Sequence, residues 1–134
     1  MIHYLLDTNI CIHFMRLKYG VAKHIEEIGW EHCCISEITV AELFYGAERS
    51  DNVAKNRKLV ESFCQDIEII PIGTALKKYA RNKAILCKQG TPIEDLDLFI
   101  GSTATANQLI MVTENVKHLQ RIPDIQIENW VNRD

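Results

Sequence analysis

Short apolar segments alternate along the chain with longer segments in which apolar residues recur at helical spacing. The short segments are rich in β-branched and large apolar side chains, which favours β-strands at residues 2–6, 32–35, 68–70, 109–112 and 125–128. Strands that alternate with helices predict βαβ units and a parallel sheet. We therefore expect one domain over residues 1–134, a three-layer α/β/α sandwich around a mostly parallel sheet of about five strands.

The first predicted strand ends in a carboxylate, because Tyr4, Leu5 and Leu6 are followed directly by Asp7. An uninterrupted apolar strand is typical of a parallel sheet that is buried on both faces. Ligands of such sheets collect at the carboxyl ends of the strands. Asp7 is therefore expected at that edge and is the first candidate for a functional side chain.

Two further acids, Glu42 and Asp97, lie in apolar segments far downstream. Glu42 interrupts a helical pattern at residues 38–46, and Asp97 precedes apolar and small residues at 98–104, which suit a helix packed closely on a sheet. Each acid also has an ordinary explanation. Glu42 could lie on a solvated helix face, and Asp97 or Asp95 could stabilise the first turn of a helix through its dipole.

Convergence of these three acids would determine the chemistry of the site. At about 5 Å and an effective dielectric constant near 20, each ionised pair would repel by roughly 3 kcal/mol. Such a cluster requires protons or a cation, and oxygen ligands without histidine or thiolate favour Mg²⁺ or Mn²⁺ over zinc. Because Mg²⁺ typically bridges to substrate phosphates, the acids point to hydrolysis of phosphodiester bonds.

The overall charge does not indicate a nucleic-acid-binding protein, because 15 Lys and Arg residues stand against 18 Asp and Glu, a net charge of −3. Any contact with a nucleic acid must come from a local patch. A helix predicted after residue 74 carries Lys77, Arg81 and Lys88 on one flank, which could follow a phosphate backbone or be an ordinary solvated face. The expected buried stripe of this helix is Leu76, Ala80, Ala84 and Cys87.

The remaining composition favours a protein of the cytoplasm. The 5 cysteines are an odd number without C-x-x-C spacing, and we expect them to be reduced and mostly buried. No signal-peptide pattern opens the chain, and no apolar run approaches the ~20 residues that span a bilayer, so no membrane partner is expected. The histidines show no metal-ligand spacing and are assigned no catalytic role; they are His3, His13, His24, His32 and His118.

Short motifs around the three acids, and others after them, follow one another in a specific order and spacing. They are Leu6-Asp7-Thr8-Asn9, Ala41-Glu42-Leu43 with Tyr45-Gly46, Asp97-Leu98-Phe99-Ile100-Gly101-Ser102-Thr103-Ala104, Val112-Thr113-Glu114-Asn115 and Ile127-Glu128-Asn129-Trp130. Together they resemble the PIN-domain ribonucleases, specifically the VapC-type toxins of bacterial and archaeal type II toxin–antitoxin (VapBC) pairs. The resemblance runs almost from end to end. Each motif is weak alone, but their shared order makes the match strong.

By this resemblance, Asp7, Glu42 and Asp97 are the expected acidic triad, which holds one or two Mg²⁺ ions, with Mn²⁺ as a substitute. Asn9 is expected to orient Asp7 or a metal-bound water. The metal would activate a water molecule for in-line attack on the phosphate and leave 3′-hydroxyl and 5′-phosphate ends. Because water is the nucleophile, a preference for RNA must come from shape and loop contacts.

The chain departs from the fuller family pattern at one position. Where many members carry a fourth acid after the fourth strand, this chain has Asn115, with Glu114 beside it. An amide can ligate a metal but supplies no charge, although Glu114 or Asp95 could compensate from a neighbouring position. We therefore expect a single metal ion in the absence of RNA.

The resemblance also implies a biological role. The expected protein is an Mg²⁺-dependent endoribonuclease toxin that cleaves structured RNA, with tRNA as the expected target, and so blocks translation. A VapB-type antitoxin would neutralise it and would be its only route to operator DNA, and the toxin itself would form a homodimer. Residues 12–17 and 41–47 are the expected docking surfaces for the antitoxin.

Two other classes of protein stay open. One is a catalytically weak PIN-fold binding module, which acts mainly through the antitoxin and operator DNA and does not hydrolyse RNA. The other is a different α/β carboxylate site, such as a phosphotransfer receiver or an aspartyl-nucleophile phosphatase. Both members of this second class fit poorly, because a receiver usually pairs acids ahead of its acceptor strand and the phosphatase motif has aspartate where Asn9 stands.

Overall fold

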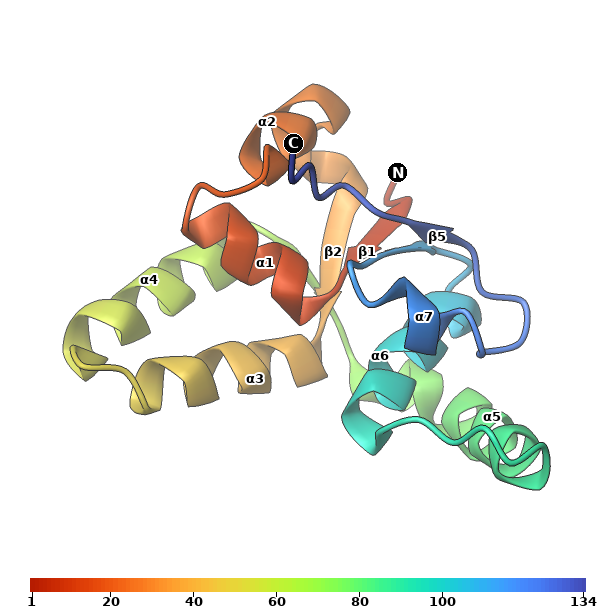
Figure 1. Cartoon of the computed structure of the whole chain (residues 1–134). Coiled ribbons are helices and arrows are strands. Elements are labelled where there is room, and N and C mark those ends of the chain that lie inside the picture. Colours follow the sequence, from red (N-terminus) through yellow and green to blue (C-terminus); the bar gives the residue numbers. More distant parts are fainter.

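The computed structural model, which describes residues 1–134, contains a five-stranded sheet in which every strand is parallel to its neighbours (Figure 1). The strand order is β3-β2-β1-β4-β5. The strands are β1 (Tyr4–Leu6), β2 (Cys33–Ser36), β3 (Glu68–Ile70), β4 (Ile110–Val112) and β5 (Ile127–Glu128). The predicted fold is confirmed, and the strands begin and end within about two residues of the predicted ranges.

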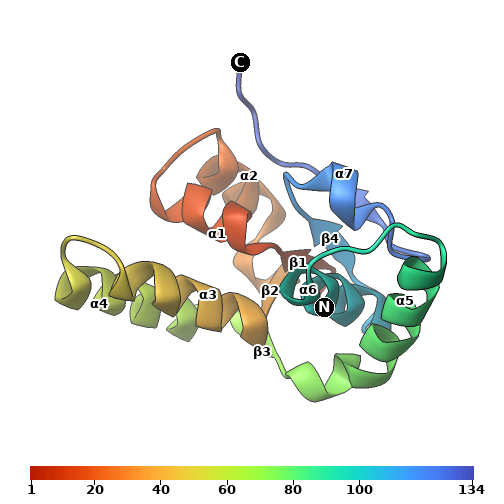
Figure 2. The ribbon, with the colours of Figure 1, turned by 60° about the horizontal axis from the view of Figure 1, so that its bottom comes forward.

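Helices cover both faces of the sheet and form the outer layers of the sandwich (Figures 1 and 2). One layer contains α1 (Thr8–Met15), α2 (Val21–Ile28), α3 (Glu37–Glu48) and α4 (Val53–Gln65). The other contains α5 (Leu76–Lys88), α6 (Asp95–Ala106) and α7 (Val116–Leu119). Short 3₁₀ helices at Trp30–His32 and Ile72–Ala75 precede β2 and α5.

Alternate residues of the central strands face opposite helical layers, so the molecule has two apolar cores. Leu6 of β1 and Val112 of β4 belong to the core under α1 to α4, whereas Leu5 and Met111 belong to the core under α5 to α7. All four side chains are fully buried. Burial on both faces accounts for the uninterrupted apolar run of β1, and it leaves Asp7 at the end of a strand in the centre of the sheet.

Helices α1 and α3 begin directly at the carboxyl ends of their strands. Ser36, the last residue of β2, caps α3, because its Oγ accepts a hydrogen bond from the Ile38 backbone N–H at 3.0 Å. Asp7 follows β1 and caps α1 in the same way, with its Oδ1 accepting from the Thr8 N–H at 2.8 Å. Both helices therefore start at the same edge of the sheet, where their first residues lie near one another.

The buried face of α5 differs from the predicted one. Helix α5 turns Asn82 and Leu86 inward, with Tyr79 half-buried. Asn82 Nδ2 donates to Ser102 Oγ of α6 at 3.0 Å, and the Tyr79 ring stacks on Phe99 of α6. A hydrogen bond and an aromatic stack thus fix this contact, and a search for apolar residues at helical spacing misses them. The predicted stripe is wrong, since all of its members are exposed: Leu76, Ala80, Ala84 and Cys87.

The cysteines and the helix lengths also bear on the predictions from sequence. All 5 cysteines are free, but only three of them are buried, and Cys87 is exposed on α5. None of the helices is both long enough and apolar enough to span a bilayer.

Helix α6 approaches the segment after α7 so closely that only glycine fits at one position. A Cβ added to Gly101 would lie 2.3 Å from Ile122 Cδ1, and Ile122 itself is buried. This close contact joins α6, which carries Asp97, to the chain that follows α7.

Replacement of Gly101 by alanine is expected to lower the free energy of unfolding by about 1–3 kcal/mol, because the added methyl overpacks the core against Ile122. The matched control is Gly46→Ala in α3, where a Cβ meets no atom within 4 Å; it should stabilise the protein by about 0.5–1 kcal/mol. Urea unfolding measures both changes. Ile122→Val removes the clashing Cδ1. The double variant Gly101→Ala with Ile122→Val should therefore lose less stability than the sum of the losses in the two single variants. A loss equal to that sum would contradict the proposed clash.

Candidate active site

Asp7 is the only charged residue among the buried residues of the protein, with 4% of its surface exposed. Its Oδ1 accepts from the Thr8 N–H at 2.8 Å, and its Oδ2 accepts from the Thr113 hydroxyl at 2.7 Å. Thr113 directly follows β4, whose Val112 pairs with Leu6, so the parallel register places the two residues side by side. Burial raises the pKa of Asp7, the hydrogen bonds from Thr113 and Thr8 oppose that shift, and the nearby charge of Glu42 adds to it.

Glu42 is held at the same edge by a chain of hydroxyl groups. The Thr8 hydroxyl donates to Glu42 Oε1 at 2.6 Å, and the buried Thr39 hydroxyl lies 3.0 Å from the Thr8 oxygen. Thr8 has only one hydroxyl proton, and it donates that proton in the hydrogen bond to Glu42. Thr39 must therefore be the donor in its hydrogen bond with Thr8. Glu42 therefore does not lie free on a solvated face, and Thr8, which also donates its backbone N–H to Asp7, links the two acids.

Asp97 lies in the first turn of α6 and is half-buried. The pKa of Asp97 is raised to about 6, mainly by burial and then by the charges of Asp7, Glu42 and Glu94, in that order. The helix dipole at this position favours the ionised form, so the upward shift is set by the other acids and by burial, not by the helix. The three acids found by sequence pattern thus act on one another electrostatically.

The site offers the oxygen ligands that a hard cation prefers, but the side chains do not form a ready-made cage. No three His, Cys, Asp or Glu side chains lie close enough together to hold a metal ion directly. Asn9, in the first turn of α1, supplies a further clue, since its Oδ1 is buried and has no hydrogen-bond partner. An unpaired buried oxygen two residues from Asp7 is costly unless a cation or a water molecule fills the gap. Mg²⁺ fits this donor set, because it usually keeps several waters between itself and the protein.

The residue at the position of the family's fourth acid, and the acids that could replace that acid, all have other partners. Asp95 Oδ1 lies 3.0 Å from Lys83 Nζ and accepts from the Tyr79 hydroxyl at 2.8 Å, which lowers the pKa of Asp95. Asn115 Oδ1 lies 2.7 Å from His118 Nδ1.

Glu114 is the acid nearest in sequence to the missing position, but two basic side chains hold it. The guanidinium of Arg133 donates to Glu114 Oε2 at 2.5 Å, and His13 Nε2 lies 3.0 Å from Oε1. Arg133 first and His13 second lower the pKa of Glu114. Asp7, Glu42 and Asp97 are therefore brought together, whereas Glu114 and Asp95 are paired with cations outside the triad.

Sequence analysis missed the threonines that orient the acids. Thr8 stands two residues after the end of β1 and Thr113 directly follows β4, and the order of the sheet makes those strands neighbours. That position was a usable signal. Thr39 gave no such signal in the sequence, because its hydrogen bond to Thr8 depends on how α3 packs beside α1.

The raised pKa of Asp97 predicts how stability varies with pH. Below about pH 4 the carboxyl group is protonated in both the folded and the unfolded chain; above the folded pKa of about 6 the folded protein carries an unfavourable charge. Asp97→Asn should therefore stabilise the protein at pH 7.5 by up to about 1 kcal/mol, allowing for its half-exposed position, and have little effect at pH 4. Asp95→Asn, in the same helical turn but with a lowered pKa, should destabilise at pH 7.5. Denaturant titrations at both pH values measure this, and a loss of stability in Asp97→Asn at pH 7.5 would contradict it.

Comparison with known proteins relates this geometry to a family. The PIN domain family model matches residues 4–125. The "tRNA(fMet)-specific endonuclease VapC" of Salmonella typhimurium is 37% identical over 134 residues, covering 97% of this chain and 99% of the relative. "Ribonuclease VapC2" of Haemophilus influenzae is 34% identical over 134 residues, covering 98% and 100%.

A solved structure agrees with the sequence relatives. A chain in the crystal structure of DNA-bound VapBC from Salmonella typhimurium superposes with a TM-score of 0.91 at 33% identity, over 97% of this chain and 99% of that chain. Similarity of this kind extends over nearly the full length of each relative, including the segments that carry the three acids. The chain therefore belongs to the PIN-domain family and, within it, to the VapC ribonucleases, as its motifs predict.

Proposed function

We propose that this protein is the toxin of a toxin–antitoxin pair and an Mg²⁺-dependent endoribonuclease that hydrolyses phosphodiester bonds in tRNA. The observation that carries the proposal is the meeting of Asp7, Glu42 and Asp97 at one edge of the sheet, where the charge of Glu42 raises the pKa of Asp7 and the charges of Asp7 and Glu42 raise the pKa of Asp97. Initiator tRNA is the first substrate to test, because a relative with 37% identity is named for that target.

The protein's own residues prepare the site in three ways. Thr113 and the Thr8 N–H fix both oxygens of the Asp7 carboxylate, so that its orientation is set before any ligand binds. Thr8, itself held by Thr39, donates to one carboxylate oxygen of Glu42. The other oxygen of Glu42 has no hydrogen-bond donor from the protein. Asp97, with a pKa of about 6, can exchange a proton near neutral pH when no cation is present.

Asp7, Glu42, Asp97 and the unpaired Oδ1 of Asn9 are the groups that would hold Mg²⁺, directly or through water. Bound Mg²⁺ would offset the repulsion between the acids and supply an activated water for attack on the scissile phosphate. We infer one ion in the absence of RNA, because Glu114 and Asp95 are both paired with cations. Mn²⁺, with the same preference for oxygen ligands, would substitute.

The basic flank of α5 is the proposed surface for the RNA backbone outside the site. Lys77, Arg81 and Lys88 are all exposed and make no salt bridge. Because the buried face of α5 is formed by Asn82 and Leu86, these three side chains point away from the protein, on the opposite side of the helix. Helix α5 packs on α6, so the flank belongs to the same layer as Asp97.

Cleavage of initiator tRNA by the purified protein tests the proposed activity. Asp7→Asn should reduce the rate about 100-fold or more, since it removes the charge at the centre of the site, and EDTA should abolish cleavage of the wild type. The matched control, Asp51→Asn, makes the same chemical change in the exposed loop before α4 and should cleave normally. Mapping of the new ends should show 3′-hydroxyl and 5′-phosphate groups. Equal cleavage by Asp7→Asn, or none by the wild type, would favour the binding-module alternative.

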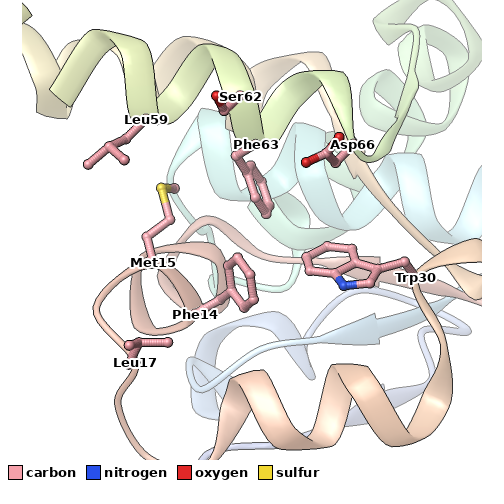
Figure 3. A pocket seen from close by; sticks show the side chains of 8 residues that line it. All are labelled: Phe14, Met15, Leu17, Trp30, Leu59, Ser62, Phe63 and Asp66. Atoms are coloured by element: carbon pink, nitrogen blue, oxygen red, sulfur yellow. The ribbon is translucent and has the colours of Figure 1, made fainter. Parts of the chain in front are cut away.

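An apolar groove between α1 and α4 is the proposed docking site for the antitoxin (Figure 3). Its volume is about 590 Å³, and Phe14, Phe63 and Trp30 point toward its interior from three different elements. The other lining residues are Met15, Leu17, Leu59, Ser62 and Asp66. Leu17 and Leu59 are large apolar side chains that are 81% and 51% exposed, which indicates a surface that a partner covers.

The occupant we propose is an apolar segment of a VapB-type antitoxin, since a similar chain has been solved in a VapBC complex bound to DNA. Operator DNA would be reached through that antitoxin. The predicted docking surface at residues 12–17 contributes three lining residues to the groove, whereas residues 41–47 contribute none and remain a prediction. The homodimer implied by the family is likewise still a prediction.

Leu59→Glu should weaken binding of the cognate antitoxin about tenfold or more, because association would bury an unpaired carboxylate in an apolar groove. Leu76→Glu is the matched control: Leu76 is 52% exposed, against 51% for Leu59, but lies on α5 in the opposite layer. Isothermal titration with purified antitoxin measures both affinities. Equal losses in the two variants, or none in Leu59→Glu, would exclude the groove as the docking site.

A further inference from the structure

A second cavity adjoins the acidic site on the side of Asp97. Its volume is about 460 Å³, within the range of roughly 300–1,000 Å³ that is typical of small-ligand sites. It lies between the N-terminal end of α6 and the segment that includes and follows α7, which are in contact with each other. The lining residues are Pro92, Ile93, Glu94, Asp97, His118 and Arg121.

The cavity has acids and bases in its wall. Glu94 and Asp97 come from the start of α6, and His118 and Arg121 come from α7 and the residues after it. The Arg121 side chain donates one hydrogen bond, from Nη1 to the Pro92 carbonyl oxygen at 3.1 Å. No carboxylate lies within 4 Å of its guanidinium, although the wall of the cavity contains two. Arg121 therefore keeps its charge and most of its N–H donors available to a ligand.

His118 is fixed in a way that suits a second contact. Its Nδ1 lies 2.7 Å from Asn115 Oδ1, so the ring is held by one nitrogen and the other nitrogen has no protein partner. The side chain is exposed. The other lining residues, Pro92 and Ile93, offer an apolar surface of the kind against which a ribose or a base can pack.

An anionic ligand with an apolar part matches these features. Three acids alone repel a phosphate, so a nucleic acid that reaches Asp97 needs cations beside them. An arginine guanidinium is well suited to a phosphate, because it can donate two parallel hydrogen bonds to its oxygens. One nucleotide of an RNA strand supplies the phosphate, the ribose and the base that the cavity can hold.

We propose that this cavity binds the nucleotide adjacent to the scissile phosphate, with Arg121 and His118 contacting the phosphate of that nucleotide. The inference rests on the proposed ribonuclease function and adds an RNA-binding subsite to it. Its cations, His118 and Arg121, come from α7 and the residues directly after it, next to Ile122, which packs against Gly101 of α6.

Arg121 could instead serve only to hold the loop at Pro92, and the experiment separates the two roles. Binding of initiator tRNA is measured in the Asp7→Asn background, where the RNA stays intact, over a range of salt concentrations. Arg121→Met keeps the length of the side chain and removes its charge; Arg121→Lys restores the charge. Lys117→Met is the matched control, because Lys117 is an exposed cation of α7 that does not line the cavity.

The expected result is about tenfold weaker binding for Arg121→Met, with the salt slope reduced by about one, and recovery to within about threefold for Arg121→Lys. Lys117→Met should change the affinity less than twofold. His118→Ala, at an exposed position, provides a second variant if Arg121→Met unfolds, and it should weaken binding about threefold. Unchanged binding in Arg121→Met and His118→Ala, or an equal loss in Lys117→Met, would overturn the proposal.

This readout is independent of cleavage. If the wild type does not cut tRNA but the Arg121 and His118 variants bind it less well, the proposed activity fails and the nucleotide site stands. If the wild type cuts tRNA while these variants bind and cut as it does, the activity stands and the nucleotide site fails.

Discussion

The burial of the Asp7 carboxylate is the constraint on which the rest of the structure depends. A carboxylate with 4% of its surface exposed needs partners for both oxygens, and Thr8 and Thr113 supply them. Thr113 can do so only because β4 lies next to β1 in parallel register, and β1 stays in the centre only because both of its faces are covered. The layered architecture therefore serves to hold one charged group at the edge of an apolar sheet.

The same constraint explains why the other acids differ in behaviour. Glu42 and Asp97 approach Asp7 from opposite helical layers, α3 and α6, and each meets a charge that is already fixed. Glu114 and Asp95, by contrast, are close in sequence to the expected positions but have found arginine, histidine or lysine partners. Proximity to a motif was not enough to place an acid in the site.

The fold and the proximity of the three acids could be predicted because their signals are local. An apolar strand that ends in Asp7, and acids set within apolar helices, are visible in single segments, and parallel connectivity brings the strand ends together. What could not be predicted depends on the rotation of helices about their axes. The prediction of the buried face of α5 was wrong because Asn82 and Tyr79, not aliphatic residues, make these contacts with α6. The place of His118 in the wall of the cavity beside Asp97 could not be predicted either, because it depends on how α7 packs against α6.

The position of β1 also has a consequence for biosynthesis. Strand β1, which precedes the other four strands in the chain, occupies the centre of the sheet, and the Thr113 hydroxyl that orients Asp7 belongs to a residue 106 positions later. Pairing of such distant segments is slow and cannot begin until both have been made. A nascent chain therefore carries Asp7 without an assembled acid cluster at least until Thr113 has been made.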